Sequence, residues 1–214
     1  MDWKALQKAI DSMLVVDKNT LRSLEESENA LDQNIKYWLK TGKLIALKKG
    51  LYIPKKMWLE ENDKDGYLEY IANYLLRPSY VSLDYVLSKY RLLTESSSVV
   101  TSVTTGTGRS FSNEISTFDY RSVSDKIFTG YEVKSYKNAF VKIASKEKAL
   151  FDFLYLRFWN REPNEINIDN LRINWENLTK KELETSREFC RLSRSKKIER
   201  TFDVIKGVYQ FSDI

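Results

Sequence analysis

The sequence predicts an α+β protein in which an N-terminal winged helix-turn-helix is followed by a mixed α/β domain with C-terminal helices. The first observation lies in residues 20–54, where two short helical segments with a polar break between them precede two apolar runs joined by a glycine turn. The second is the stretch from 98 to 144, which is rich in Val, Ile, Thr, Phe and Tyr and favours strands. The third is helical periodicity from residue 145 onward.

The N-terminal domain is expected to span residues 1–58 and to begin with two helices. An apolar stripe at helical spacing predicts the first helix, and it consists of Trp3, Leu6, Ile10, Met13 and Leu14. Val15-Val16 is expected to form a short strand. The second helix is expected over 20–26 with Thr20 as its N-cap, and Ser27 or Asn29 is expected to cap the third.

The third helix has two unlike faces. Its apolar face consists of Leu31, Ile35, Trp38 and Leu39, and its polar face of Asn29, Gln33, Lys36 and Lys40. Amide and ammonium groups are the donors that read base edges and phosphates, so the polar face is predicted to enter a major groove. Asn29 and Gln33 are expected to contact adenine, and Lys36 guanine. The alternative is a solvated helix face with no such role.

A basic hairpin is predicted directly after this helix. Gly42 stands where a helix C-terminus favours glycine. The runs LIAL and LYI then flank Lys48-Lys49-Gly50, whose tip is expected to lie over a phosphate backbone or minor groove. Phosphate contacts are predicted for Lys43, Lys48 and Lys49, against the alternative of surface lysines unrelated to DNA. Tyr37 would stack on a sugar or pack within the domain.

Residues 65–214 are expected to form the second domain, after a polar connector at 55–66 and a boundary between 56 and 65. Helices are predicted at 67–76 and 83–93, strands within 98–105, 114–123, 126–133 and 139–144, and a hairpin turn at 106–110. The segment 146–158 is predicted as a helix on which Lys148 and Asp152 form an i,i+4 pair of modest strength. Two or three further helices follow, and Thr179 and Glu182 fit a capping box.

Composition argues against an enzyme. The chain has 214 residues, a net charge of +5, no histidine and one cysteine, Cys190, so the commonest general base and metal ligand are missing. Asp119, Asp125 and Asp152 match no metal-ligand spacing, and we expect no catalytic residues, no metal and no cofactor. The alternative is a nuclease or nucleotidyltransferase tethered by the N-terminal domain, but the carboxylate pairs that it needs are not evident.

The excess positive charge is uneven. Residues 1–58 hold eleven Lys or Arg against seven Asp or Glu, which favours an anionic partner. A second basic cluster near the C-terminus consists of Arg187, Arg191, Arg194, Lys196, Lys197 and Arg200. This cluster would contact DNA flanks or an acidic protein, and a solvated face is the alternative. Neither a secretory signal nor a membrane span is evident, so a cytoplasmic protein without membrane contact is expected.

The segment KIASKEKALFDFLYLR at 142–157 resembles the signature of the AbiEi family, the antitoxins of bacterial type IV toxin–antitoxin systems. The pattern is a strand ending in Ile-Ala-Ser, then Glu-Lys-Ala-Leu, with an Asp two residues on, here Asp152. Residues 42–54 are similar to the family's wing, and 130–133 to a short family strand. Residues 78–93 are similar to its Ser-x-x-x-Ala-Leu helix, although Tyr85-Val86 precede the leucine here in place of a small residue. The resemblance covers residues 1–160.

The resemblance implies a winged-helix repressor of its own operon that binds inverted repeats in double-stranded DNA. It also implies a second domain that counters a nucleotidyltransferase-like toxin, functionally and not through a stable complex, or by some weaker contact. The Glu-Lys-Ala-Leu segment would then be structural, a helix start packed on a sheet. A palindromic site would require two copies of the chain, as a dimer on DNA. The alternative is an ordinary winged-helix regulator whose second domain binds a ligand or oligomerises.

Overall fold

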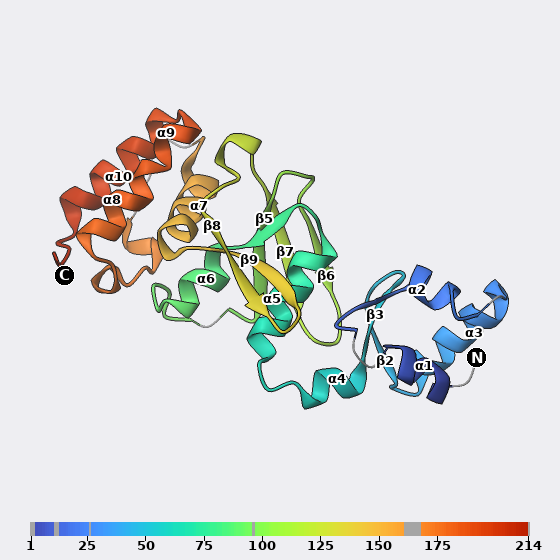
Figure 1. Cartoon of the computed structure of the whole chain (residues 1–214). Coiled ribbons are helices and arrows are strands. Elements are labelled where there is room, and N and C mark those ends of the chain that lie inside the picture. The colour runs from blue at the N-terminus through green and yellow to red at the C-terminus, as the bar shows by residue number, and fades with distance from the viewer. Residues whose placement is uncertain (1–2, 11–12, 26, 96, 161–167, 214) are drawn as a thin grey trace.

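The computed structural model describes residues 1–214 except 1–2, 11–12, 26, 96, 161–167 and 214, and it is a mixed α+β fold. An N-terminal unit of helices and a small sheet lies at one end, a large sheet lies in the middle, and a group of helices lies at the other end (Figure 1). The N-terminal unit is residues 3–54, and the central sheet carries the elements that follow. The two chain ends therefore lie far apart.

The N-terminal unit combines three helices with a three-stranded antiparallel sheet in the order β1-β3-β2. Its elements are α1 (Trp3–Ile10), β1 (Val16–Asp17), α2 (Lys18–Arg22), α3 (Glu28–Lys40), β2 (Leu44–Lys48) and β3 (Leu51–Pro54). One core joins them, formed by Leu6, Ile10, Val16, Leu21, Leu31, Ile35, Trp38, Leu44 and Tyr52. The apolar face predicted for the third helix is thus its buried face, with Leu39 partly buried at its margin.

Capping side chains set the helix ends in this unit. The prediction of Thr20 as an N-cap is wrong, because Asp17 caps α2 by accepting a hydrogen bond from the backbone N–H of Thr20. Asp17 also ends β1, so the strand passes into the helix without a loop. Ser27, one of the two expected caps, caps α3. Gly42 follows α3 with φ +67°, the left-handed conformation that glycine adopts without strain.

The central sheet has six strands in the order β6-β7-β5-β4-β9-β8. The strands are β4 (Ser79–Val81), β5 (Val99–Thr104), β6 (Arg109–Ser112), β7 (Thr117–Ser122), β8 (Tyr131–Tyr136) and β9 (Ala139–Ala144). The pairs β5–β7 and β4–β9 are parallel and the others antiparallel. Strands β6 and β8 are therefore the two edges.

Helices cover both faces of the central sheet. They are α5 (Lys64–Leu75), α6 (Leu83–Lys89) and α7 (Lys146–Phe158), with a 3-10 turn at Asp125–Ile127. Helix α4 (Lys55–Glu60) precedes them and contacts β3. Val81, Ser102 and Tyr120 are in register across β4, β5 and β7 and so share a face, and the Tyr120 hydroxyl donates to the Ala72 carbonyl of α5 at 2.6 Å. Tyr80 points to the opposite face, where α7 lies.

Several predicted elements of this region are wrong in detail. The connector at 55–66 contains α4 and the start of α5. Residues 106–110 are not a hairpin turn, because β7 lies between β5 and β6, and β6 already begins at Arg109. The strand predicted over 126–133 begins only at Tyr131, after the 3-10 turn. The helix predicted over 83–93 is shorter: α6 ends at Lys89, and Arg91, two residues later, has a left-handed φ of +58°.

The C-terminal group consists of α8 (Lys180–Glu188), α9 (Cys190–Ser193) and α10 (Lys196–Val208), preceded by 3-10 turns at Ile168–Leu171 and Trp175–Asn177. The predicted capping box is confirmed, because Thr179 and Glu182 each bond the other's backbone N–H. Cys190 is buried, and burial raises the pKa of its thiol to about 12, so it is a core residue.

A buried ion pair lies where α7 meets the sheet. The Lys148 ammonium donates to the Asp152 carboxylate, and both side chains are 0% exposed, so this pair is not the modest surface interaction that the spacing predicted. Asp152 also accepts hydrogen bonds from the hydroxyls of Tyr80 at 2.9 Å and Ser82 at 2.8 Å. Burial raises the pKa of Asp152 and lowers that of Lys148, and their mutual attraction opposes both shifts.

Breaking this pair should cost far more stability than breaking an exposed pair of the same spacing. Asp152→Ala leaves a buried ammonium without its carboxylate and should lower the free energy of unfolding by about 3–5 kcal/mol. Lys148→Met/Asp152→Asn removes both charges and keeps an acceptor for Tyr80 and Ser82, so it should cost less than Asp152→Ala. Urea unfolding followed by tryptophan fluorescence measures both.

The matched control is Glu60→Ala, which removes the exposed i,i+4 pair Lys56–Glu60, whose charges are 3.8 Å apart. This change should cost less than about 0.5 kcal/mol. An equal loss in Glu60→Ala and Asp152→Ala would show that the buried pair does not hold the core together.

Candidate nucleic-acid interface

The predicted polar face of α3 is open to solvent along its length. Asn29, Gln33, Lys36 and Lys40 are exposed and succeed one another at intervals of three and four residues, so they form one row. Leu31, Ile35 and Trp38 on the other side of the helix are buried. The helix is therefore fixed by its apolar face, and the amide and ammonium groups point away from the core.

Basic residues of α2 neutralise the acidic residues of α3. Lys18 contacts Glu28 at 2.6 Å and Asp32 at 2.5 Å, and Arg22 contacts Glu28 at 2.8 Å. The hydrogen bonds from Arg22 and Lys18 lower the pKa of Glu28 to about 2. Lys36 and Lys40 have no ion pair among the described residues. The open row thus carries positive charge that no carboxylate of α3 cancels.

The ammonium group of Lys43 lies over two aromatic rings, those of Trp3 and Tyr37. The Lys43 ammonium lies 5.1 Å from the centre of the Trp3 ring and 5.6 Å from that of Tyr37. Trp3 in turn packs on Trp38, with ring centres 5.7 Å apart. Tyr37 is 55% exposed, so its ring borders the row and is not part of the core.

The hairpin β2–β3 is arranged differently from the prediction. Lys48 was expected at a free tip, but its ammonium donates to the Leu75 carbonyl of α5 at 2.7 Å and lies 5.4 Å from the centre of the Phe111 ring. Burial, together with nearby Arg109, lowers the pKa of Lys48. The prediction that Lys48 lies at a free tip is therefore wrong, because its charge is used at the junction with the central sheet. Lys49 remains exposed at the turn.

The same hairpin is buried on both faces. Leu44 and Tyr52 pack into the core of the N-terminal unit. The opposite side of the hairpin packs into the core of the central sheet, through Ile45, Leu47, Leu51 and Ile53. The side chain of Asn113, from the turn between β6 and β7, donates to the Leu47 carbonyl at 3.1 Å. The hairpin is thus a shared layer between two cores.

The two basic surfaces predicted from the sequence lie at opposite ends of the molecule. Helix α3 lies at one end, and α9 and α10 at the other (Figure 1). In the second cluster Arg187 pairs with Asp203 at 2.5 Å and Lys197 donates to the Asn160 carbonyl at 3.3 Å. Exposed charges remain on Arg191, Arg194, Lys196 and Arg200. The two clusters do not form one surface.

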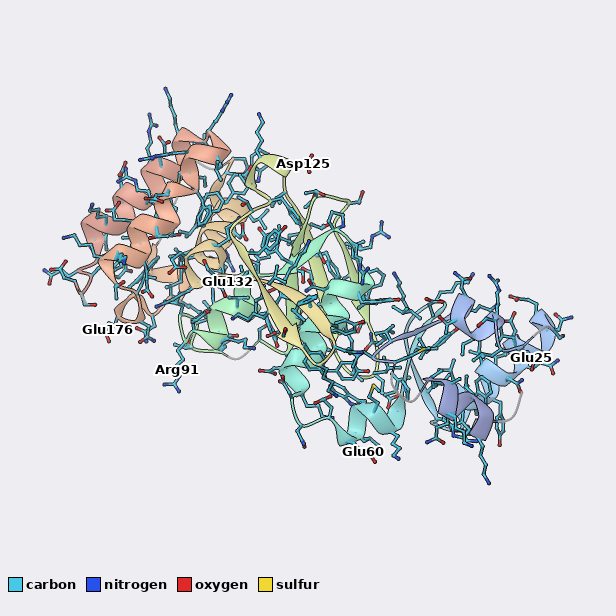
Figure 2. The ribbon with its side chains drawn as sticks, viewed as in Figure 1. Glu25, Glu60, Arg91, Asp125, Glu132 and Glu176 are labelled. Carbon is cyan, nitrogen blue, oxygen red and sulfur yellow. The ribbon has the colours of Figure 1, made fainter. Side chains whose placement is uncertain are left out.

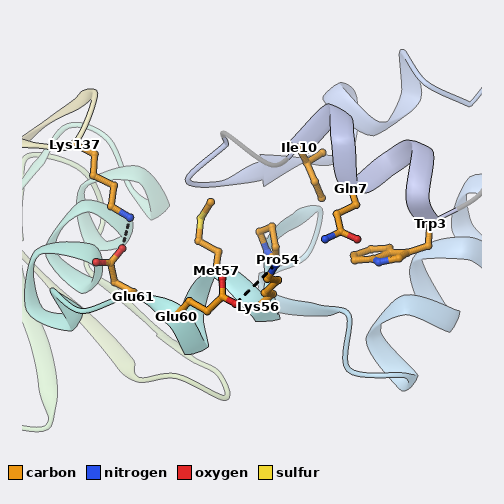
Figure 3. Close-up of a pocket in the computed structure, with 9 residues that line it drawn as sticks. All are labelled: Trp3, Gln7, Ile10, Pro54, Lys56, Met57, Glu60, Glu61 and Lys137. Atoms are coloured by element: carbon orange, nitrogen blue, oxygen red, sulfur yellow. Dashed lines mark hydrogen bonds and ion pairs between the residues drawn. The ribbon is translucent and has the colours of Figure 1, made fainter.

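A pocket of about 290 Å³ lies at the junction between α1 and α4. Its walls are Trp3, Gln7 and Ile10 from α1, Pro54, Lys56, Met57 and Glu60 from β3 and α4, and Glu61 and Lys137 beyond them (Figure 3). Apolar side chains and charged groups of both signs thus meet where the N-terminal unit joins the remainder. Its residues are distant in the chain, so no local sequence pattern indicates this pocket.

Two comparisons with known proteins were negative. No protein-family model matches the chain, and no curated protein matches it significantly. Within the described residues, no group of three or more His, Cys, Asp or Glu is placed to hold a metal ion. In the same part of the chain, no helix is long and apolar enough to cross a bilayer.

Glu61 should make stability at the junction depend on pH. Burial acts to raise its pKa, but hydrogen bonds from Lys137, Tyr136 and the Asp63 backbone lower it from 4.5 to about 2. Because the pKa is lowered on folding, its contribution is complete above the unfolded value and is lost as the pH falls toward 2. Glu61→Gln should be less stable than wild type at neutral pH, and the difference should shrink under acid.

Urea titrations over a pH series measure that difference. Glu176→Gln is the control, because Glu176 is exposed (Figure 2) and has no ion pair among the residues described. A difference between wild type and Glu61→Gln that stays constant down to the acid limit would contradict this role of Glu61.

Proposed function

We propose that the chain binds double-stranded DNA through α3 and represses transcription of its own operon. The observation that carries the proposal is the open row of Asn29, Gln33, Lys36 and Lys40 on a helix whose other face is buried. Amides contact adenine edges and ammonium groups contact guanine or phosphate, so this row has the chemistry of a recognition helix. Three helices followed by a hairpin are consistent with a winged helix.

In this mechanism α3 enters the major groove with its N-terminal half toward the bases. Asn29 and Gln33 are the adenine readers and Lys36 the guanine reader. Lys40, Lys43 and Lys49 contact phosphates, and Tyr37 packs on a sugar beside them. Lys48 takes no part, since its ammonium is bonded to the Leu75 carbonyl. A repressor of this kind needs no catalytic group.

The second proposed activity is neutralisation of a nucleotidyltransferase-like toxin encoded in the same operon. It rests on the resemblance of residues 142–157 to the AbiEi signature. Lys148 and Asp152 of that segment are the buried ion pair of α7, so in this proposal they maintain the fold and do not act on a substrate.

The alternative is a transcriptional regulator whose activity is controlled by a small ligand. The junction pocket favours it, because a ligand between α1 and α4 would contact both the N-terminal unit and the first helix after it. Such a ligand would raise the melting temperature by binding only the folded state. Binding of this ligand would also change the affinity of the chain for DNA, whereas the antitoxin proposal requires no ligand-dependent change in DNA affinity.

Fluorescence anisotropy on the chain's own upstream DNA tests repression. We expect binding that is tighter than to scrambled DNA and that falls steeply with salt. Gln33→Ala should lose about 1–3 kcal/mol on the cognate site and little on scrambled DNA. Lys49→Ala should weaken both complexes evenly and reduce the salt slope by about one.

Lys48→Ala is the matched control, since it removes the neighbouring ammonium, which already has a protein partner. It should leave DNA affinity unchanged while lowering thermal stability. Equal affinity for both DNAs, together with no effect of Gln33→Ala, would rule out a sequence-reading α3.

Co-expression with the toxin tests the antitoxin activity separately. Wild type, driven from an inducible promoter, should restore growth of cells that express the toxin. Gln33→Ala should restore growth equally well, because α3 lies at the end of the molecule away from α7 and the C-terminal helices (Figure 1). Continued growth arrest with folded, abundant protein would contradict this activity.

A further inference from the structure

The outermost strand of the central sheet, β8, is an open edge. It pairs with β9 on one side, and no described strand pairs with its other side. Four successive residues of β8, 132–135, are exposed. An exposed edge of this length presents unpaired N–H and C=O groups and is a template for pairing with another strand.

The backbone groups that point outward can be assigned from the pairing with β9. The Ser145 N–H donates to the Gly130 carbonyl, which makes Gly130 and Ser145 a hydrogen-bonded pair. Since such pairs alternate in an antiparallel ladder, the backbone groups of Tyr131, Val133 and Ser135 point away from β9. These three residues carry the free donors and acceptors of the edge.

The side chains beside this edge differ between its two faces, and one face carries two exposed apolar residues beside the half-buried Lys142, the direct partner of Val133. Val133 is 58% exposed, and Phe140, on the neighbouring strand and the same face, is 72% exposed. Glu132, labelled in Figure 2, and Lys134 lie on the opposite face, and both are exposed. The edge therefore combines two exposed apolar side chains with one negative and one positive residue two positions apart, which lie 3.6 Å from each other within β8.

This charge pattern is complementary to itself in an antiparallel register centred on Val133. A two-fold axis there places Val133 opposite its own copy, and Glu132 opposite Lys134 of the other copy, twice. The outward backbone groups then also match, because Val133 faces Val133 and Tyr131 faces Ser135. Centring on Lys134 would oppose two lysines, and centring on Glu132 two glutamates, so charge selects the Val133 register.

We propose that β8 is a self-association surface that pairs antiparallel with β8 of a second copy of this chain, joining the two central sheets into one. The partner is another copy because β8 itself carries the alternation of charge that this register needs. The inference does not depend on DNA binding. It would, however, supply the two copies that an inverted repeat requires.

Sedimentation velocity without DNA, over a concentration series, tests the proposal. Wild type should reach twice the mass of one chain. Val133→Pro removes an outward donor while leaving the pairs with β9 intact, and it should stay monomeric. Glu132→Lys and Lys134→Glu each place like charges opposite each other twice and should raise the dissociation constant about tenfold.

The double variant Glu132→Lys/Lys134→Glu restores opposite charges and should dimerise like wild type. Glu176→Lys, the same change at an exposed site on another element, should have no effect. Circular dichroism confirms that each variant is folded. A wild type that stays monomeric at its highest soluble concentration, or single charge variants that still dimerise like wild type, would overturn the proposal.

Discussion

The buried pair of Lys148 and Asp152 is the constraint on which the centre of the molecule depends. Asp152 accepts hydrogen bonds from Tyr80 of β4 and from Ser82 at the start of α6, so one carboxylate links α7 to the sheet and to α6. The Lys148 ammonium lies 4.8 Å from the centre of the Phe151 ring and 5.4 Å from that of Phe189. Because Phe189 is the C-cap of α8, the C-terminal helices are built on the same pair. An ion pair without exposure is stable only with its full set of partners, so these elements must assemble together.

Gly130 shows how closely the pieces around this pair fit. A Cβ at this position would lie 2.6 Å from the Phe189 ring and 3.0 Å from Cδ of Lys148, and the residue has φ +76°. Only glycine satisfies both the backbone conformation and the space. The turn that leads into β8 therefore passes directly over the ion pair. The open edge strand β8 thus begins directly beside the buried ion pair.

Most predictions hold where neighbouring residues decide the structure and fail where distant residues decide it. Thr20 is a local exception, because Asp17, three residues away, caps α2 in its place. The apolar face of α3 and the capping box of Thr179 with Glu182 depend on neighbours within one or two turns and were predicted, and Ser27 was one of the two caps expected for α3. The position of β7 between β5 and β6 depends on long-range pairing that no local pattern encodes. Lys48 was assigned to a free tip because its partners, Leu75 and Phe111, are far along the chain. One signal was available: LIAL and LYI are continuous apolar runs, which are typical of strands covered on both sides.

The double burial of the β2–β3 hairpin has a consequence for how the chain folds and how it can be divided. Ile45, Leu47, Leu51 and Ile53 belong to the core of the central sheet although they precede the connector at 55–66. A fragment that ends at Pro54 would expose this apolar layer to water, and a fragment that begins after it would lose the same layer from its core. The N-terminal unit is therefore not expected to fold independently of the central sheet. We expect the intact chain to melt in one cooperative transition and the isolated N-terminal fragment to aggregate.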